Sequence, residues 1–505
     1  MKSLLKIYLA AAFITAVSCD DDTKDPLTEP INTTVNFQYK STIQVGGEGA
    51  SEISAYDPIT KNLFTVNVES QQISIYNIDN LSTPQQKTPI EIGTYGSPNS
   101  VAVSNGKLAV AVEALTKQND GVILLFDTTD SSLIEKYTVG ALPDMVTFSK
   151  DGKLIISANE GEPNSDYTID PKGTISIIDI AKNTTTILDF AAFNADLNSL
   201  TNNGFRVFGP NASLENDVEP EYIAVSEDSK VAWVSLQENN GIAKINLVNK
   251  TIENIYPLGF KDYNITGNEI DASDKDGVKE LKNWPVKSMY QPDAITSVNI
   301  NGTEYIISAN EGDSRDYDGF SEETRVSKIT LDETAFPTSQ NFQDESKLGR
   351  LKITTTLGDT DNDGDYDELY SYGARSFSIW TENVDLIYDS GNSIAVETLN
   401  ATPNIFNGDD GRSDDKGAEP ESVEILNIGD QRYILFVGLE RNSQVLVYDI
   451  TNPNAPIFLN ILSHSGDQAP EGLLAIPASE SPSGKDLLVV SNEDSGTVTF
   501  YENIQ

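Results

Sequence analysis

An aspartate-rich segment, residues 358–368, is the part of this chain best suited to bind a metal ion. Asp stands at positions one, three and five of this segment, counted from Asp359, and Gly stands at position six. This pattern matches the first half of a calcium loop, where alternate carboxylates point inward and Gly permits a sharp turn. Tyr370 stands where such a loop has Glu, so Asp367, Glu368 or a residue from elsewhere must complete the shell. A solvated acidic turn is the alternative. The predicted Ca²⁺ ligands are Asp359, Asp361, Asp363, Asp365 and Asp367.

A second set of acids recurs at one position of a repeated unit. Residues 142–160 and 291–311 both run from Pro-Asp through two apolar-alternating stretches to Ser-Ala-Asn-Glu. In a circular repeat, equivalent positions lie on one ring about the axis, and carboxylates that converge there repel one another unless a cation neutralises them. We therefore predict an axial metal site, with a second divalent metal possible, although such acids could instead accept backbone N–H bonds or pair with Arg. The set comprises Glu69, Glu113, Glu160, Glu238, Glu311, Glu440 and Glu493.

Basic residues lie beside acids in three loops and are candidates for binding an anionic group. A guanidinium near a metal site can hold a phosphate or carboxylate, whereas the alternative is a counter-ion for the protein's own acids. The candidates are Arg315, Arg375, Arg412 and Lys416.

Composition excludes several classes of site. The chain has one Cys and one His, so it cannot form a thiolate or multi-histidine metal centre, and it has no phosphate-binding or dinucleotide-binding glycine motif. With 78 acidic and 34 basic residues the formal charge is −44, which makes nucleic acid and anionic lipid poor partners and divalent cations good ones. Hydrolysis, if present, would have to be metal-assisted.

The amino terminus has the pattern of a lipoprotein export signal. Basic residues precede an apolar run too short to span a bilayer, and small residues precede Cys19, the predicted lipidation site. The acids after Cys19 resemble a sorting signal for the outer face of the outer membrane, with a periplasm-facing protein as the alternative. The predicted parts are a signal peptide (1–18), an acidic flexible tether (19–35) and one domain (36–505), and we expect a monomer whose only membrane contact is the lipid.

The elements that must position these acids are short strands repeated every 40 to 60 residues. Such a period is typical of a β-propeller, so we predict an all-β fold with loop insertions. Eight blades are favoured, and seven are expected if residues 371–398, which match the repeated unit only weakly, do not form a blade. Helical spacing at residues 189–204 predicts a helix, and residues 256–290 and 332–370 form two further insertions.

Several motifs resemble those of the choice-of-anchor I domain, which is similar to mesenchyme-specific cell-surface glycoproteins and to bacterial alkaline-phosphatase-like proteins. The resemblance implies a propeller displayed outside the cell on a variable anchor, here Cys19, and an association with calcium or phosphate. It transfers no catalytic residue. The motifs are residues 157–163, 208–213, 219–225, 283–285, 373–380, 414–421 and 438–441.

These observations lead to one main hypothesis and two alternatives. The main hypothesis is a cell-envelope lipoprotein whose calcium-binding propeller holds a ligand on an acidic axial face. The first alternative is a calcium-dependent phosphomonoesterase, in which metal-bound water attacks and Arg375 or Arg412 stabilises phosphoryl charge. The second is a protein-interaction propeller without catalysis.

Overall fold

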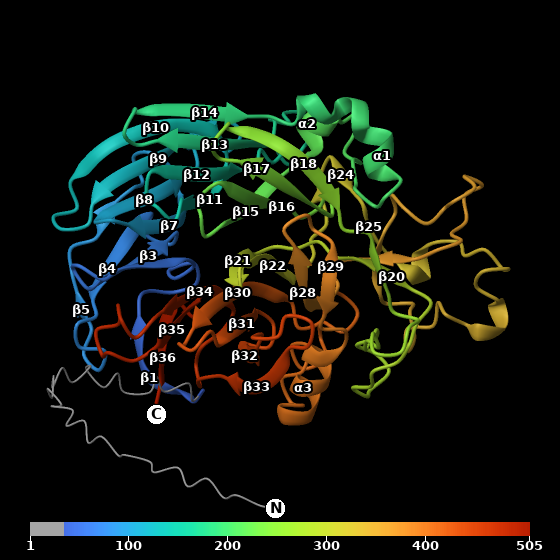
Figure 1. Cartoon of the computed structure of the whole chain (residues 1–505). Coiled ribbons are helices and arrows are strands. Elements are labelled where there is room, and N and C mark those ends of the chain that lie inside the picture. The colour runs from blue at the N-terminus through green and yellow to red at the C-terminus, as the bar shows by residue number, and fades with distance from the viewer. Residues whose placement is uncertain (1–34, 505) are drawn as a thin grey trace, which may run out of the picture.

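The computed structural model describes residues 35–504, which fold almost entirely into antiparallel sheets arranged around a centre (Figure 1). Six sheets have four strands and one has five. The first four sheets comprise β2 (Ser54–Asp57), β3 (Asn62–Asn67), β4 (Gln72–Asn77), β5 (Gln85–Gln86) and β6 (Ile90–Glu91); β7 (Pro98–Ser104), β8 (Lys107–Val112), β9 (Asp120–Asp127) and β10 (Leu133–Ala141); β11 (Pro143–Phe148), β12 (Leu154–Asn159), β13 (Thr174–Asp179) and β14 (Thr184–Leu188); and β15 (Pro220–Val225), β16 (Val231–Leu236), β17 (Gly241–Asn246) and β18 (Thr251–Pro257).

The other three sheets follow in the second half of the chain, and the last one also takes a strand from the beginning of the described residues. They comprise β21 (Ile295–Ile300), β22 (Thr303–Asn310), β28 (Ser376–Thr381) and β29 (Leu386–Asp389); β30 (Pro420–Asn427), β31 (Tyr433–Leu439), β32 (Gln444–Asp449) and β33 (Ile457–Leu462); and β34 (Pro470–Ile476), β35 (Leu487–Asn492), β36 (Thr497–Asn503) and β1 (Phe37–Gln44).

The first strands of the sheets form a closed ring. Contacts run from β2 through β7, β11, β15, β21, β30 and β34, and β34 contacts β2. The pairing of β1 with β36 joins the two ends of the described chain in one sheet, so the ring is closed by hydrogen bonds as well as by packing. This topology confirms the predicted all-β propeller.

Hydrophobic side chains fill each junction between neighbouring sheets, which explains the alternating pattern of the strands. Phe64 of β3 and Val110 of β8 belong to one such cluster, and Phe436 of β31 and Val490 of β35 belong to another. Seven clusters of this kind follow one another around the described ring. Burial of these side chains supplies the main stabilisation of each junction.

The segment at residues 371–398 does not form a sheet of its own. Its strands β28 and β29 complete the sheet begun by β21 and β22, after an insertion of 65 residues between Asn310 and Ser376. The described residues therefore contain seven sheets of four or five strands.

The insertions form small structures beside the ring. The predicted helix at 189–204 is η1 (Ala191–Asp196) followed by α1 (Leu197–Thr201), and it ends before Gly204, whose φ is 95°. The other insertions share a hydrophobic cluster that includes Phe336 and Leu351. Their elements, with the remaining short helices, are α2 (Leu214–Asp217), β19 (Phe260–Asp262), β20 (Lys287–Met289), β23 (Asp316–Tyr317), β24 (Phe320–Ser321), β25 (Glu323–Arg325), η2 (Val326–Lys328), η3 (Thr338–Gln340), β26 (Lys352–Thr354), β27 (Tyr370–Ser371) and α3 (Ser393–Ala401).

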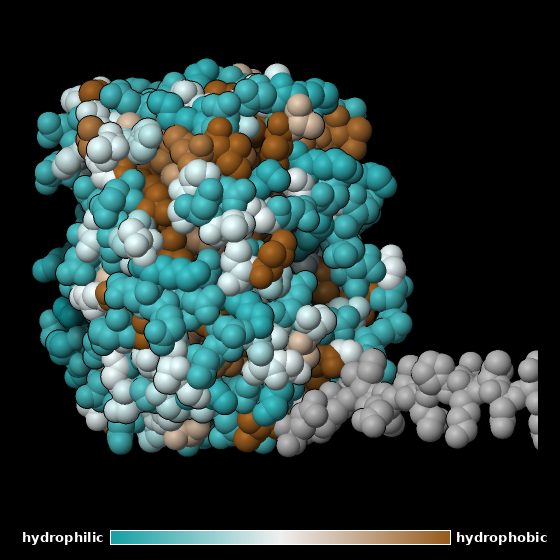
Figure 2. Space-filling model, turned by 90° about the vertical axis from the view of Figure 1, so that its left-hand side faces the viewer, coloured by the Kyte–Doolittle hydropathy of each residue, from teal (hydrophilic) through white to brown (hydrophobic). Residues whose placement is uncertain are grey.

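The side of the molecule seen in Figure 2 is mostly hydrophilic, with hydrophobic residues gathered in patches in its upper part. No helix within residues 35–504 is long and apolar enough to cross a membrane. The predicted signal peptide, Cys19 and nearly all of the tether lie outside the described residues.

Candidate metal centre

Acidic side chains line the hollow at the centre of the ring. Two cavities of about 420 and 320 Å³ share lining residues there, among them Asp144, Glu160 and Asp293. One residue at the beginning of each first strand, or just before it, contributes to this lining, and six of the seven are acids. We call these seven residues the axial ring: Glu52, Asn99, Asp144, Glu221, Asp293, Glu421 and Glu471.

Backbone irregularities accompany the axial ring. In five sheets the register between the first and second strands shifts directly after the strand's initial Pro, where the ring residue lies. A β-bulge of this kind releases one residue from the ladder and re-aims its side chain. Leu142 and Ala469, which precede two of these prolines, have φ values of 49° and 56°, a left-handed conformation that non-glycine residues adopt mainly where the surroundings enforce it.

In the Asn-Glu pairs of the repeat, the Asn has a structural role and the Glu contributes its side chain to the site. Asn159, at the end of β12, is buried, and its Nδ2 donates to the Thr174 carbonyl at 3.1 Å and to the Ser176 hydroxyl at 2.9 Å on β13. The next residue, Glu160, donates its backbone N–H to the Leu142 carbonyl at 2.8 Å, which holds its side chain beside the axial ring. The Asn thus links two strands by hydrogen bonds, and the Glu side chain projects into the hollow.

The structure places most of the seven predicted glutamates at this centre. Glu113, Glu160, Glu311, Glu440 and Glu493 line the two cavities, and Glu238 lies beside Glu160. Glu69 differs, because its side chain is exposed and accepts a hydrogen bond from the Gly47 N–H at 2.8 Å. For Glu69 the structure therefore matches the alternative of a backbone hydrogen bond.

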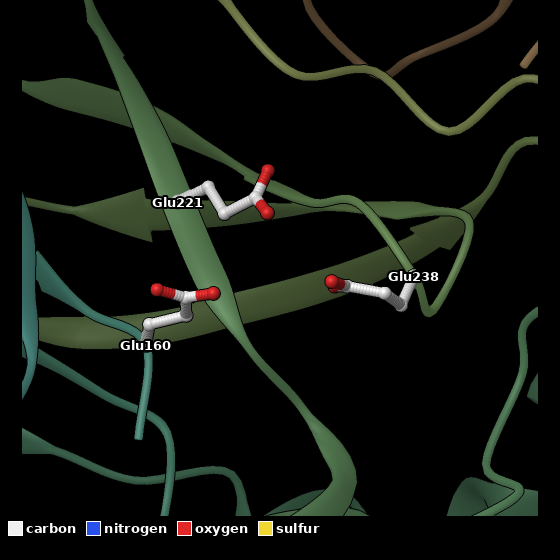
Figure 3. A group of neighbouring side chains, drawn as sticks. All are labelled: Glu160, Glu221 and Glu238. Carbon is white, nitrogen blue, oxygen red and sulfur yellow. The ribbon is translucent and has the colours of Figure 1, made fainter. Parts of the chain in front are cut away.

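Glu160, Glu221 and Glu238 form a compact group, which we call the open triad. One oxygen from each lies within 4.8 Å of the others, and Figure 3 shows the Glu238 carboxylate pointing toward the other two. Glu221 and Glu238 are only 9% and 6% exposed, and in each one buried Oε2 has no hydrogen-bond partner within residues 35–504. None of the three forms an ion pair in that part of the chain.

Burial raises the pKa of all three carboxyls of the open triad, and in Glu238 it outweighs the opposing charge of Arg315. Burial raises the pKa of Glu238 to about 7. Burial, followed by the charges of neighbouring acids, raises the pKa values of Glu160 and Glu221 well above the usual range for Glu. Ionisation of the triad therefore raises the free energy of the folded protein considerably unless a cation binds there.

The neighbouring part of the ring contains cations of its own. The oxygens of Asp293, Glu311 and Glu421 also lie within 4.8 Å of one another, and Lys416 Nζ forms an ion pair with Glu311. A third group joins Glu311 to Glu419 and Glu440. The pKa of Glu419, despite its burial, is lowered, because Lys416, Arg412 and Arg441 surround its carboxylate.

The four basic candidates all have partners within the protein. Arg315 is 1% exposed, pairs with Asp217 at 2.6 Å and Glu219 at 3.0 Å, and lies over the Phe208 ring. Arg375 donates to the carbonyls of Asp271 at 2.8 Å and Asp415 at 2.6 Å. Arg412 and Lys416 bind acids, as described above. The contacts of Arg315, Arg412 and Lys416 match the alternative of internal counter-ions, whereas Arg375 binds backbone carbonyls. Binding of an external anion stays a prediction for all four.

The predicted calcium loop lies in an insertion beside the ring. Asp359, Asp361 and Asp367 place one oxygen each within 4.8 Å of one another. Asp332 from an earlier segment joins Asp365 and Asp367 in a second group, so a residue from elsewhere is available to complete a shell. Glu368 instead pairs with Lys287 at 2.7 Å.

The remaining loop carboxylate, Asp363, forms a hydrogen bond within the loop itself. Asp363 accepts the backbone N–H of Asp365 at 3.1 Å and belongs to neither oxygen group. Calcium binding by this loop remains a prediction.

The axial ring is the part of the centre that the predicted site residues omitted. The repeat analysis recognised an acid after Pro but selected only the Glu at the end of the second strand. The missed signal is the recurring Pro-acid pair, at Asp144, Glu221, Asp293, Glu421 and Glu471.

Comparison with known proteins identifies a family and two relatives. Residues 52–453 match the model of the choice-of-anchor I domain. The chain is 32% identical over 190 residues to Gigasin-3a of Magallana gigas, covering 32% of this chain and 66% of that protein. It is 28% identical over 337 residues to the mesenchyme-specific cell surface glycoprotein of Strongylocentrotus purpuratus, covering 59% of this chain and 42% of that protein. The match thus spans less than two thirds of each relative.

Solved structures resemble the chain only distantly. Hydrazine synthase of Kuenenia stuttgartiensis has a TM-score of 0.48 at 11% identity, covering 90% of this chain and 96% of that one. The Cps50 (Swd1) β-propeller domain of Myceliophteria thermophila has a TM-score of 0.46 at 8% identity, covering 92% and 100%. The fold assignment therefore rests on the sheet topology described above.

Proposed function

The chain belongs to the choice-of-anchor I domain family, and we propose that this β-propeller protein of the cell surface binds a divalent cation, Ca²⁺, in the open triad. The observation that carries the proposal is the pair of buried Oε2 atoms of Glu221 and Glu238, which lack any partner among the described residues. A buried carboxylate oxygen without a hydrogen bond or counter-ion is costly, and a metal ion supplies both charge and coordination.

Calcium fits the triad better than a smaller cation. Ca²⁺ takes about six to eight oxygen ligands at about 2.3–2.6 Å, so two ligands of one ion lie at most about 5 Å apart. The oxygens of Glu160, Glu221 and Glu238 meet this limit. Three carboxylates leave coordination positions for water or for a ligand, and Glu160 and Glu221 line the cavity of about 320 Å³ from which a ligand would come.

The cation is proposed to hold an external ligand at the cavity mouth. The mesenchyme-specific glycoprotein is named as a cell surface protein, and a calcium-bridged surface ligand agrees with that location. Anchoring through a lipid on Cys19, on the outer face of the outer membrane, is part of the same proposal. The loop at Asp359–Asp367 is proposed to bind a second Ca²⁺ that stabilises the insertions.

A metal-dependent phosphoric-ester hydrolase is the second candidate function. Glu52 favours it, because burial, followed by repulsion from Glu493, raises its pKa to about 8, close to the pH at which a general acid or base works best. Glu52 and the open triad's Glu160 line the same cavity. Hydrolysis of a generic phosphomonoester that is lost in EDTA and restored by Ca²⁺ would establish this activity. Absence of turnover at any Ca²⁺ concentration would refute it.

Calorimetric titration tests the binding proposal. The wild-type chain and Glu221→Gln are titrated with Ca²⁺, and Glu69→Gln serves as the control, because Glu69 occupies the same repeat position as Glu160 but lies outside the cavities. We expect Glu221→Gln to lose one bound ion per chain and Glu69→Gln to keep it. Equal stoichiometry in all three proteins would refute the proposal.

A further inference from the structure

The Lys416 ammonium pairs with Glu311, one of the three carboxylates in the second group of the hollow. We propose that Lys416 is a built-in cation that, through its ion pair with Glu311, closes a second cation position formed by Asp293, Glu311 and Glu421, and thereby limits the hollow to one metal ion. The inference rests on the proposed function, since it takes the open triad to be the position that the metal fills.

The second group matches the open triad in its ligands. In both groups three carboxylates from neighbouring sheets place one oxygen each within 4.8 Å of one another. Both groups also leave a buried carboxylate oxygen without a hydrogen-bond partner among the described residues, and in the second group it is Oε2 of Glu421. By ligand type and spacing alone, each group could hold a divalent cation.

The ammonium distinguishes the two groups. Lys416 Nζ pairs with Glu311 and lies 3.8 Å from both Asp313 and Glu419. The Lys416 side chain is only 13% exposed, so its charge is screened little by solvent. An ammonium bound directly to Glu311 repels a second cation that approaches the same carboxylate.

The segment that carries Lys416 is fixed by contacts on both sides of it. Arg375 donates to the carbonyls of Ser413 at 3.1 Å and Asp415 at 2.6 Å. Gly417 has a φ of 75°, and a Cβ there would lie 3.1 Å from Cδ of Arg375. This packing gives Arg375 a role that differs from anion binding, because it positions the lysine segment against the ring.

Removal of the ammonium would leave one carboxylate group uncompensated. Glu311 would keep only the neutral Gln237 amide, at 3.0 Å. The third group would stay compensated, because Arg412 binds Glu419 at 2.6 Å and Arg441 binds it at 3.0 Å. Lys416→Met, which keeps the length of the side chain and removes its charge, is therefore expected to open one new cation position and no more.

Calcium stoichiometry by equilibrium dialysis of the full chain tests the inference. All proteins carry Asp361→Asn and Asp367→Asn to remove the insertion loop from the count. We expect one ion per chain in this background and two after Lys416→Met. Lys416→Arg, which keeps the charge, and the pair Lys416→Met with Glu311→Gln, which removes a ligand as well, are both expected to bind one.

The outcomes separate the two proposals. No added ion after Lys416→Met overturns the role of Lys416, whatever the background binds. An added ion in a background that binds none refutes the open triad as a metal site and supports the second cation position. If Lys416→Met does not fold in excess calcium, Lys416→Gln is measured in its place. Failure of both to fold in calcium overturns the inference, because the added ion is expected to replace the ammonium.

Discussion

Replacing Glu238 by Gln should stabilise the metal-free protein while it removes a metal ligand. Glu238 is 6% exposed, lies next to two other carboxylates, and has an Oε2 without a partner in the described chain. Gln has nearly the same shape and carries no charge. Its amide N–H can also donate to Glu160 or Glu221, neither of which forms an ion pair within residues 35–504.

The size and pH range of the effect follow from the pKa of Glu238. Its pKa rises from 4.5 to about 7 on folding, mainly because of burial, and each pH unit of difference corresponds to about 1.4 kcal/mol, so the ionised form costs the folded state about 3 kcal/mol. Below pH 4.5 the carboxyl is protonated in both states, and the cost is absent. As the pH rises, the folded state holds its proton longer than the unfolded state does, so stability falls between about 4.5 and 7 and stays low above that.

Urea unfolding in EDTA at pH 4.5 and pH 8 measures the difference directly. We expect Glu238→Gln to raise the free energy of unfolding at pH 8 by about 1–3 kcal/mol and to leave it unchanged at pH 4.5. In excess Ca²⁺ the order reverses, since the variant has lost a ligand. Glu69→Gln, at an exposed position outside the cavities, is the control. A Glu238→Gln protein less stable than wild type at pH 8 in EDTA would refute the reasoning.

Three further perturbations are predicted. Asn159→Ala removes the hydrogen bonds that tie β12 to β13 and should lower the free energy of unfolding by about 2–3 kcal/mol in urea titrations, whereas no change would show that the amide is not structural. Gly312→Ala should cost on the order of 3 kcal/mol in the same assay, because φ is 92° and a Cβ would lie 2.1 Å from the Gly373 nitrogen; wild-type stability would contradict this strain. Asp361→Asn with Asp367→Asn should remove the luminescence of one bound Tb³⁺ ion that Ca²⁺ can displace, and should leave binding at the open triad intact. Unchanged luminescence would exclude the loop as a site.

Much of the fold could be predicted from the sequence because the strands repeat. Period-two alternation identified the strands, and the recurring Asn-Glu identified equivalent positions. The number of sheets was harder to obtain, because residues 371–398 have the pattern of a unit but pair with β22 across a long insertion. Sequence patterns define strands well but do not show which distant strand completes a sheet.

The candidate site was predicted only in part. The glutamates at the ends of second strands lie at the axis, with the exception of Glu69, but the Pro-acid residues of the axial ring were not selected. Their inward direction depends on a bulge and on a left-handed residue before Pro, as at Leu142, and local sequence does not reveal either. The pairing of Lys416 with Glu311 joins residues 105 positions apart, so the division of the ring into open and filled groups required the structure.

The most direct measurement is a crystal structure of the protein grown with Tb³⁺ in place of Ca²⁺, with anomalous data collected to locate the ions. The account predicts an anomalous peak bound by Glu160, Glu221 and Glu238, and no peak among Asp293, Glu311 and Glu421, because Glu311 already pairs with Lys416. A crystal with a peak at the Asp359–Asp367 loop but none in the open triad would contradict the central claim.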